Sequence, residues 1–182
     1  MSFFKIVCLA CALFISVPTY AEDIPATPPF TLTSSDFKDG DELDKRFEFN
    51  GFGCAGENKA PVMWFGGAPE NTKYFALTMY DPDAPTGSGW WHWVVINIPA
   101  TEHKLDVKAL PDGAIETHTD YGVSGFGGAC PPMGDKPHHY IFTLYALKDK
   151  IPLEADVPAA QIGFYIHNLK IAEAKMTATY GR

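Results

Sequence analysis

Apolar and polar positions alternate with a period of two residues in three long segments, and this alternation predicts β-strands. The segments are rich in β-branched and aromatic residues: "KYFALTMYD" at 73–81, "HWVVINIP" at 92–99 and "HHYIFTLYAL" at 138–147. Shorter apolar stretches at 30–49 and 60–69 predict short strands, because the first contains a turn at Asp39-Gly40 and the second ends in Gly-Gly and Pro. The pattern therefore indicates a mainly β protein.

The last part of the chain changes to a helical period. Between residues 158 and 176, apolar side chains recur at Ile162, Tyr165, Ile166, Leu169 and Ala172. This spacing predicts one helix near the C-terminus, followed by a short strand from Met176 to Tyr180. The Gly- and Pro-rich region 99–137 predicts a long loop, and such a loop in a compact domain is usually functional. We find no repeats and expect a single β-rich domain over residues 22–182.

The first 21 residues have the layout of a secretory signal peptide. One early lysine precedes an apolar run of 12 residues, from Ile6 to Val17, and small residues precede a cut after Ala21. A membrane anchor needs about 20 apolar residues, so the run is short for that alternative. A lipoprotein cut at Cys11 is the other alternative, with Cys8 where a leucine-like residue is usual. We expect a periplasmic or secreted protein after cleavage near Ala21.

Charge and cysteine content narrow the possible partners. The net charge is −8 and becomes −9 when the signal peptide and its one lysine are removed. No cluster of lysine and arginine is present, which argues against a nucleic-acid partner, and the oligomeric state stays open. Cleavage leaves Cys54 and Cys130, and a lone pair in an exported protein most often forms a disulfide, worth about 4 kcal/mol here. Two free thiols or half of a metal site are the alternatives.

Titratable groups lie at the ends of the three long predicted strands. Period-two alternation puts each of them on the same face as apolar residues of its strand. These faces comprise Asp81 with Phe75, Leu77 and Met79; His92 with Val94 and Ile96; and His138 with Tyr140, Phe142 and Leu144. If the three faces look toward one core, Asp81, Tyr140 and the two histidines converge at its rim.

Two proline-containing turns border these strand ends. The segment "DPDAP" at 81–85 cannot continue a central strand, because proline lacks the amide donor. Its aspartates can accept backbone N–H groups, and the bond before Pro85 is a plausible cis site. Alone, this segment indicates only a rigid turn with capping acids. A second turn, "GACPPMGDKPHHY" at 128–140, leads into the strand of His138 and favours a binding site.

Motifs for metal binding and catalysis are incomplete. The Asp-Pro-Asp segment opens like a calcium loop but lacks the required glycine. The segment "GVSGF" ends in Phe126, where a nucleophile elbow needs glycine. A zinc site from His92, His138 and an aspartate is chemically possible but is not the favoured reading. A hydrolase using Asp81, His92 and Tyr140 would lack an activated nucleophile. We therefore predict no metal, no cofactor and no catalytic residue.

Three segments together resemble the phosphatidylethanolamine-binding protein family, which includes Raf-kinase-inhibitor-like members. They are "DPDAP", "WWHWVVINIP" and "GACPPMGDKPHHYIFTLYAL", in that order with a long loop before the third. The resemblance extends from about residue 30 to the end and is strongest to the bacterial YbhB/YbcL-like subgroup. It implies a large antiparallel sheet packed on a smaller one, with few peripheral helices. It also implies a small anion pocket for phosphate-like groups and phospholipid headgroups.

The resemblance also assigns the pocket residues. These are Asp81, Asp83, His92, Gly128, Pro131, Pro132, His138 and Tyr140. The chain departs from the family at His139, where many members have arginine, and at Trp91, where the eukaryotic branch has histidine, so a kinase-inhibitor role transfers poorly. We expect a non-enzymatic protein that binds a phosphate-bearing small molecule or a headgroup such as phosphoethanolamine. The alternative is an interaction protein that inhibits a protease or kinase or acts on host cells.

Overall fold

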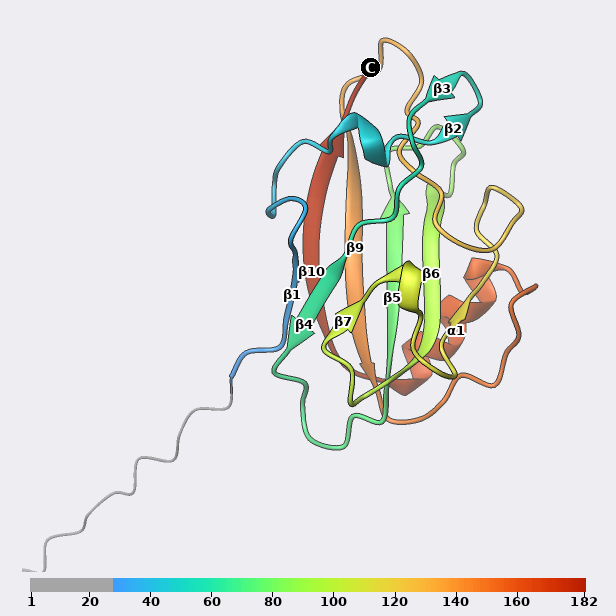
Figure 1. The fold of residues 1–182 in the computed structure, drawn as a ribbon. Helices are drawn as coiled ribbons and strands as arrows, with labels where there is room; N and C mark the ends of the chain where they lie inside the picture. Colours follow the sequence, from blue (N-terminus) through green and yellow to red (C-terminus); the bar gives the residue numbers. More distant parts are fainter. Residues whose placement is uncertain (1–27) are drawn as a thin grey trace, which may run out of the picture.

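The strands predicted by alternation form the centre of a five-stranded antiparallel sheet (Figure 1). The computed structural model describes residues 28–182, so the expected signal peptide lies outside the described part of the chain. The strand order is β10–β9–β5–β6–β8. The strands are β5 (Tyr74–Asp81), β6 (Trp90–Pro99), β8 (Ile115–Glu116), β9 (His138–Leu147) and β10 (Lys170–Tyr180).

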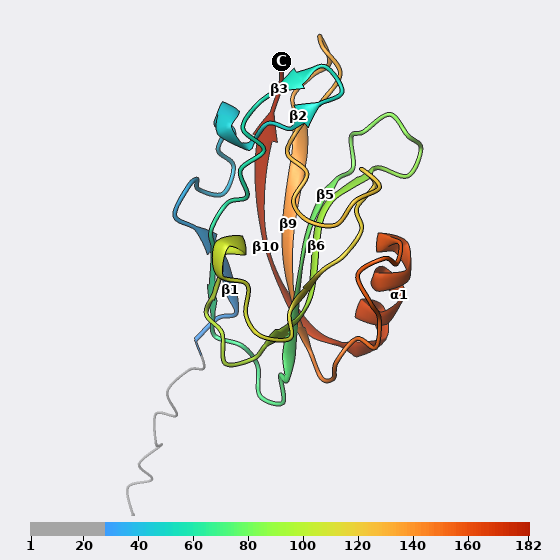
Figure 2. The ribbon, with the colours of Figure 1, turned by 45° about the vertical axis from the view of Figure 1, so that its right-hand side comes forward.

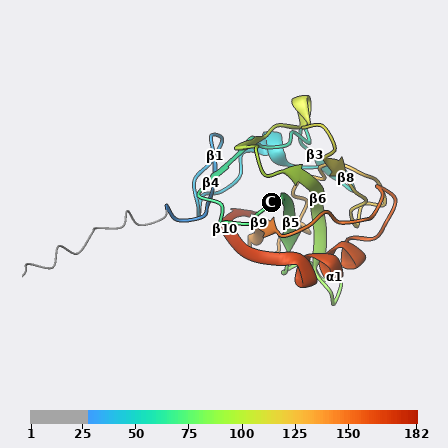
Figure 3. The same cartoon turned by 90° about the horizontal axis from the view of Figure 1, so that it is seen from below.

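A smaller sheet and a helix cover opposite faces of the large sheet (Figures 2 and 3). The smaller sheet has the order β1–β4–β7, with β1 (Thr31–Ser34), β4 (Met63–Gly66) and β7 (Lys104–Leu105). The helix is α1 (Ala159–Leu169), and a separate hairpin joins β2 (Asn50–Gly51) to β3 (Cys54–Ala55). Two 3₁₀ turns complete the described elements, at Lys45–Phe47 and Val107–Ala109. This arrangement confirms the fold class that the resemblance implies.

Period-two alternation sends neighbouring residues of each strand into two different apolar cores. Leu77 and Phe142 lie in the larger core between the two sheets. Ala76 and Ile96 lie in the smaller core, where Ile162 of α1 packs against the large sheet. Each fully buried large apolar side chain contributes roughly 1.5–3 kcal/mol by its removal from water. The large sheet is therefore covered on both faces around its centre, and its polar chemistry is confined to the ends of the strands.

The predicted extent of the C-terminal helix is wrong. The helix ends at Leu169, and residues 170–180 form β10, which pairs antiparallel with β9 along its length. Within β10, every second side chain from Ala174 to Tyr180 is buried, so a period of two replaces the helical period. Without β10, strand β9 would present a long unpaired edge. Pairing with β9 thus outweighs the local helical signal around Ala172.

A β-bulge reverses the predicted face of His92. Met79 of β5 pairs with Trp93, but the next residue, Tyr80, pairs with Trp91, so His92 is an extra residue in β6. Alternation predicts that His92 shares a face with Val94 and Ile96, which the structure places in the smaller, helix-side core. The bulge instead directs it to the side of the larger core, because an extra residue shifts the alternation by one position. The strand also begins at Trp90, two residues earlier than predicted.

Two isoleucine variants measure how much the helix-side core contributes to stability. Ile162 is 1% exposed, whereas Ile171, just after the helix, is 39% exposed. We expect Ile162→Ala to lower the free energy of unfolding by about 2–5 kcal/mol, because it leaves a cavity. The matched variant Ile171→Ala should cost less than about 1 kcal/mol. Urea denaturation of both variants tests this expectation, and equal losses would contradict it.

Candidate functional site

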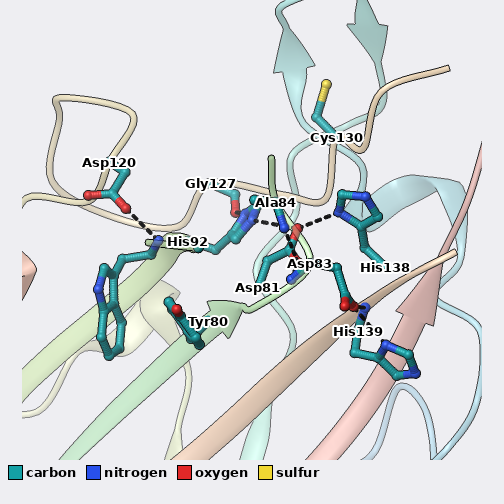
Figure 4. A network of polar contacts seen from close by, with 12 residues as sticks. Tyr80, Asp81, Asp83, Ala84, His92, Asp120, Gly127, Cys130, His138 and His139 are labelled. Atoms are coloured by element: carbon teal, nitrogen blue, oxygen red, sulfur yellow. Dashed lines mark hydrogen bonds and ion pairs between the residues drawn. The ribbon is translucent and has the colours of Figure 1, made fainter. Parts of the chain in front are cut away.

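Three buried polar side chains meet at one end of the large sheet, where β5 ends and β6 and β9 begin (Figure 4). Asp81, His92 and His138 are only 2%, 3% and 4% exposed. The His138 Nδ1–H donates to Asp81 Oδ2 at 2.7 Å, and His92 Nε2 lies 4.0 Å from the same oxygen. The strand ends therefore bring one carboxylate between two imidazoles.

Asp81 also anchors the turn that follows β5. Its Oδ1 accepts hydrogen bonds from the backbone amides of Asp83 at 2.8 Å and Ala84 at 3.1 Å. Aspartate commonly accepts such amides in tight turns. The bond before Pro85, which the sequence suggests as a cis site, is trans. Because both carboxylate oxygens of Asp81 have donors, the orientation of the side chain is fixed before any ligand arrives.

One ring nitrogen of His92 is hydrogen-bonded to backbone carbonyls, and the other lies toward Asp81. Its Nδ1 lies 2.9 Å from the carbonyl oxygen of Gly127 and 3.1 Å from that of Gly128. Since both neighbours are acceptors, Nδ1 carries the hydrogen and donates it. Burial lowers the pKa of His92, against the opposing effects of these carbonyls and Asp81. The neutral ring is thus favoured, and its Nε2 has a free lone pair.

A cavity of about 190 Å³ opens beside these groups. Asp81, His92 and His138 line it, together with the turn residues Ala84, Pro85 and Thr86. The remaining walls come from Phe52, Trp90, Tyr121, Cys130, Pro131 and Pro132. Within residues 28–182, no lysine or arginine lines this cavity. Its polar character therefore depends on one carboxylate, two imidazoles and neutral donors.

Three of the residues assigned by the resemblance lie outside the cavity lining. Asp83 turns away, and its Oδ2 accepts from the His139 amide at 2.8 Å and from His139 Nδ1 at 2.7 Å (Figure 4). These hydrogen bonds from His139 lower the pKa of Asp83. Gly128 lies behind His92, where a Cβ would come within 2.2 Å of the Phe47 carbonyl oxygen.

Tyr140, the third of these residues, lies beneath the site with its ring centre 5.1 Å from that of His92. Its hydroxyl is buried and has no well-formed hydrogen bond within residues 28–182. Burial, and then the charge of Asp81, raise the pKa of Tyr140, so the phenol stays protonated. It therefore supplies a neutral hydroxyl next to His92.

The sequence did not single out Phe52 or Tyr121 as site residues, whereas Trp90 belongs to the aromatic group at 90–93 that borders His92 in the sequence. Tyr121 comes from the long loop, packs edge-on against His92 and donates its hydroxyl to the Gly128 carbonyl at 2.8 Å. Phe52 stacks on Tyr121 from the β2–β3 hairpin. Loops and hairpin tips have no periodicity from which a buried face can be read, so the only available signal was the length of the loop.

Two cross-links hold the β2–β3 hairpin against the Pro131-Pro132 wall. The structure joins Cys54 to Cys130 in a disulfide, with their Cα atoms 6.0 Å apart. Arg182 makes the second link, since its Nε donates to the Pro131 carbonyl at 2.6 Å and its Nη1 to the Gly53 carbonyl at 2.9 Å. The cavity walls that contain Phe52 and Pro131 are therefore fixed to each other.

Two kinds of feature are absent from residues 28–182. No group of three His, Cys, Asp or Glu side chains in this range is placed to hold a metal ion. None of the helices in the same range combines the length and the apolar character needed to cross a membrane.

Comparisons with known proteins give a coherent result. The sequence profile of the phosphatidylethanolamine-binding protein family matches residues 33–181. The chain is 51% identical over 159 residues to the UPF0098 protein YbcL of Escherichia coli, covering 83% of this chain and 87% of YbcL. It is 45% identical over 156 residues to the UPF0098 protein YbhB of the same organism, covering 82% of this chain and 98% of YbhB.

Solved structures agree with these sequence matches. The crystal structure of Escherichia coli YbcL, described as a new member of the mammalian PEBP family, superposes with a TM-score of 0.82 at 50% identity. The superposition covers 84% of this chain and 98% of that one. The PEBP homologue CT736 of Chlamydia trachomatis superposes with a TM-score of 0.72 at 28% identity, covering 84% and 97% of the two chains.

Removal of the disulfide should loosen one wall of the cavity. We expect the variant Cys54→Ser/Cys130→Ser to lose about 2–5 kcal/mol of unfolding free energy, because the unfolded chain regains the freedom that the cross-link removed. Denaturant titration measures this loss. Amide NMR shifts should change around Gly53 and Gly134 and stay constant in α1. A stability equal to that of the unmodified protein, or shifts spread evenly over the chain, would contradict the expectation.

Proposed function

The chain belongs to the phosphatidylethanolamine-binding protein family, and we propose that it binds the phosphate group of a small ligand in the cavity beside Asp81. The ligand is free phosphate or a headgroup such as phosphoethanolamine. One observation carries the proposal: a cavity of about 190 Å³ is lined by the Asp81, His92 and His138 side chains, which are otherwise nearly fully buried. Polar side chains that converge on one enclosed cavity are the usual feature of a small-ligand site.

The arrangement of charges suits a ligand that is not simply an anion. Asp81 orients His138 through the hydrogen bond at Nδ1, and within residues 28–182 no lysine or arginine lines the cavity. Asp135 lies outside the cavity lining, with its carboxylate 3.6 Å from Nε2 of the lining residue His138 and its side chain 47% exposed. An exposed carboxylate in this position is a partner for the ammonium of an ethanolamine headgroup. Phe52, Trp90 and Tyr121 exclude water from the bound group.

Binding, and not catalysis, is the role that the cavity chemistry supports. The hydroxyl of Thr86 donates to the Gly89 carbonyl, and Cys130 is held in the disulfide. The hydroxyl of Tyr121 donates to Gly128, and burial together with the charge of Asp81 raises the pKa of this phenol. Each of these potential nucleophiles is thus kept protonated or covalently blocked.

We also propose that the protein acts in an oxidising compartment, the periplasm or the extracellular space. The Cys54–Cys130 disulfide supports this location, because such bonds persist in exported proteins and are rare in the reducing cytosol. The signal peptide expected for residues 1–21 would provide the route of export.

Substitution of the central carboxylate and the bulged histidine tests the binding site. We expect Asp81→Ala and His92→Ala each to weaken binding of inorganic phosphate by at least about tenfold, which corresponds to the loss of one hydrogen bond to a charged group. NMR titration with phosphate gives the affinities, and thermal melts establish that each variant is folded.

Asp149→Ala and His167→Ala are the matched controls, since both residues are exposed and distant from the cavity in the fold. They should bind phosphate like the unmodified protein. Unchanged affinity in both Asp81→Ala and His92→Ala would refute the assignment of this cavity as the phosphate site.

A further inference from the structure

The inner end of the cavity presents hydrogen-bond acceptors to a ligand, which is unusual for a site that receives an anion. The two carbonyls at His92 Nδ1 leave Nε2 as an acceptor. Asp81 Oδ2 lies 4.0 Å from that nitrogen, so a second acceptor faces the same space. A bare phosphate oxygen between these two atoms would be repelled by both. A hydroxyl group in that place would be attracted by both.

The groups around His92 do not supply a positive charge that would offset the repulsion of a phosphate oxygen by these two acceptors. In the large sheet, His92 faces Asp81 of β5 and Tyr140 and His138 of β9. From the long loop, His92 is in contact with Tyr121 and is influenced by the charge of Asp120. Both phenols stay neutral because burial raises the pKa of each. The nitrogens of His138 lie beside the carboxylates of Asp81 and Asp135.

We propose that the cavity selects phosphate monoesters in their protonated, monoanionic form, whose P–O–H group donates to the acceptor pair His92 Nε2 and Asp81 Oδ2. This inference rests on the proposed function and narrows its ligand class. A phosphate diester, such as the phosphate of an intact phospholipid, has no P–O–H group. A free headgroup such as phosphoethanolamine has one, as does inorganic phosphate.

Three small ligands distinguish a phosphate monoester, as in a free headgroup, from a phosphate diester, as in an intact phospholipid. Methyl phosphate is a monoester whose second pKa is near 6, so much of it is a protonated monoanion at pH 5.5. Dimethyl phosphate is a monoanionic diester without a proton, as in an intact lipid. Methyl sulfate is a monoanion of similar shape that also carries no proton. At pH 5.5 the comparison therefore separates the effect of the ligand's proton on affinity from the effect of its negative charge.

We expect methyl phosphate to bind the full chain at least about tenfold more tightly than either other ligand at pH 5.5, as measured by NMR titration. The ratio of affinities should fall as the pH is raised to 8, because the monoanion becomes scarce. Equal affinities for methyl phosphate and methyl sulfate, or a ratio that rises with pH, would overturn the inference while leaving phosphate binding intact.

The variant Asp81→Asn supplies an independent measurement, because its amide can donate to an unprotonated oxygen. We expect this variant to reduce the preference for methyl phosphate over methyl sulfate by at least about fivefold. Asp149→Asn, at an exposed site, should leave the preference unchanged. If Asp81→Asn does not fold, the three-ligand comparison on the unmodified protein decides alone. If none of the three ligands binds that protein, the proposed function fails and this inference fails with it.

Discussion

The hydrogen bond between His138 and Asp81 is the constraint around which the candidate site is organised. It joins the beginning of β9 to the end of β5, two strands that are neighbours in the large sheet. The other oxygen of Asp81 holds the turn at Ala84, which forms part of the cavity wall. A buried carboxylate with donors at both oxygens has little freedom to reorient, so the direction of its acceptor oxygens is set by the fold. The cavity is therefore preorganised.

The β-bulge in β6 places the imidazole of His92 beside the carboxylate of Asp81, which already has His138 as a neighbour. His92 faces Asp81 only because one extra residue interrupts the alternation of the strand. The carbonyls of Gly127 and Gly128 then select which ring nitrogen carries the hydrogen. Acceptors thus collect at the inner end of the cavity, beside its aromatic walls. The proposed phosphate ligand is compatible with this aspartate if its P–O–H group donates a hydrogen bond to the carboxylate.

The outer walls depend on contacts between segments that are far apart in the chain. The disulfide and Arg182 both tie the β2–β3 hairpin to the proline-rich segment before β9. Phe52, at the tip of that hairpin, has a positive φ of 52° and is 71% exposed, yet it stacks on Tyr121. These links position an aromatic side chain at the mouth of the cavity, where it can cover a bound group.

The sequence by itself determined the three long strands, the polar groups at their ends and the proline turns beside them. Alternation and proline chemistry are local properties, and they predicted where Asp81 and His138 lie relative to the larger core. Only the tertiary structure decided the face of His92, the end of α1 at Leu169 and the pairing of Asp83 with His139 instead of the cavity. Each of these depends on a pairing between strands or a contact between distant segments, whose free energy exceeds the local preference of the residues involved.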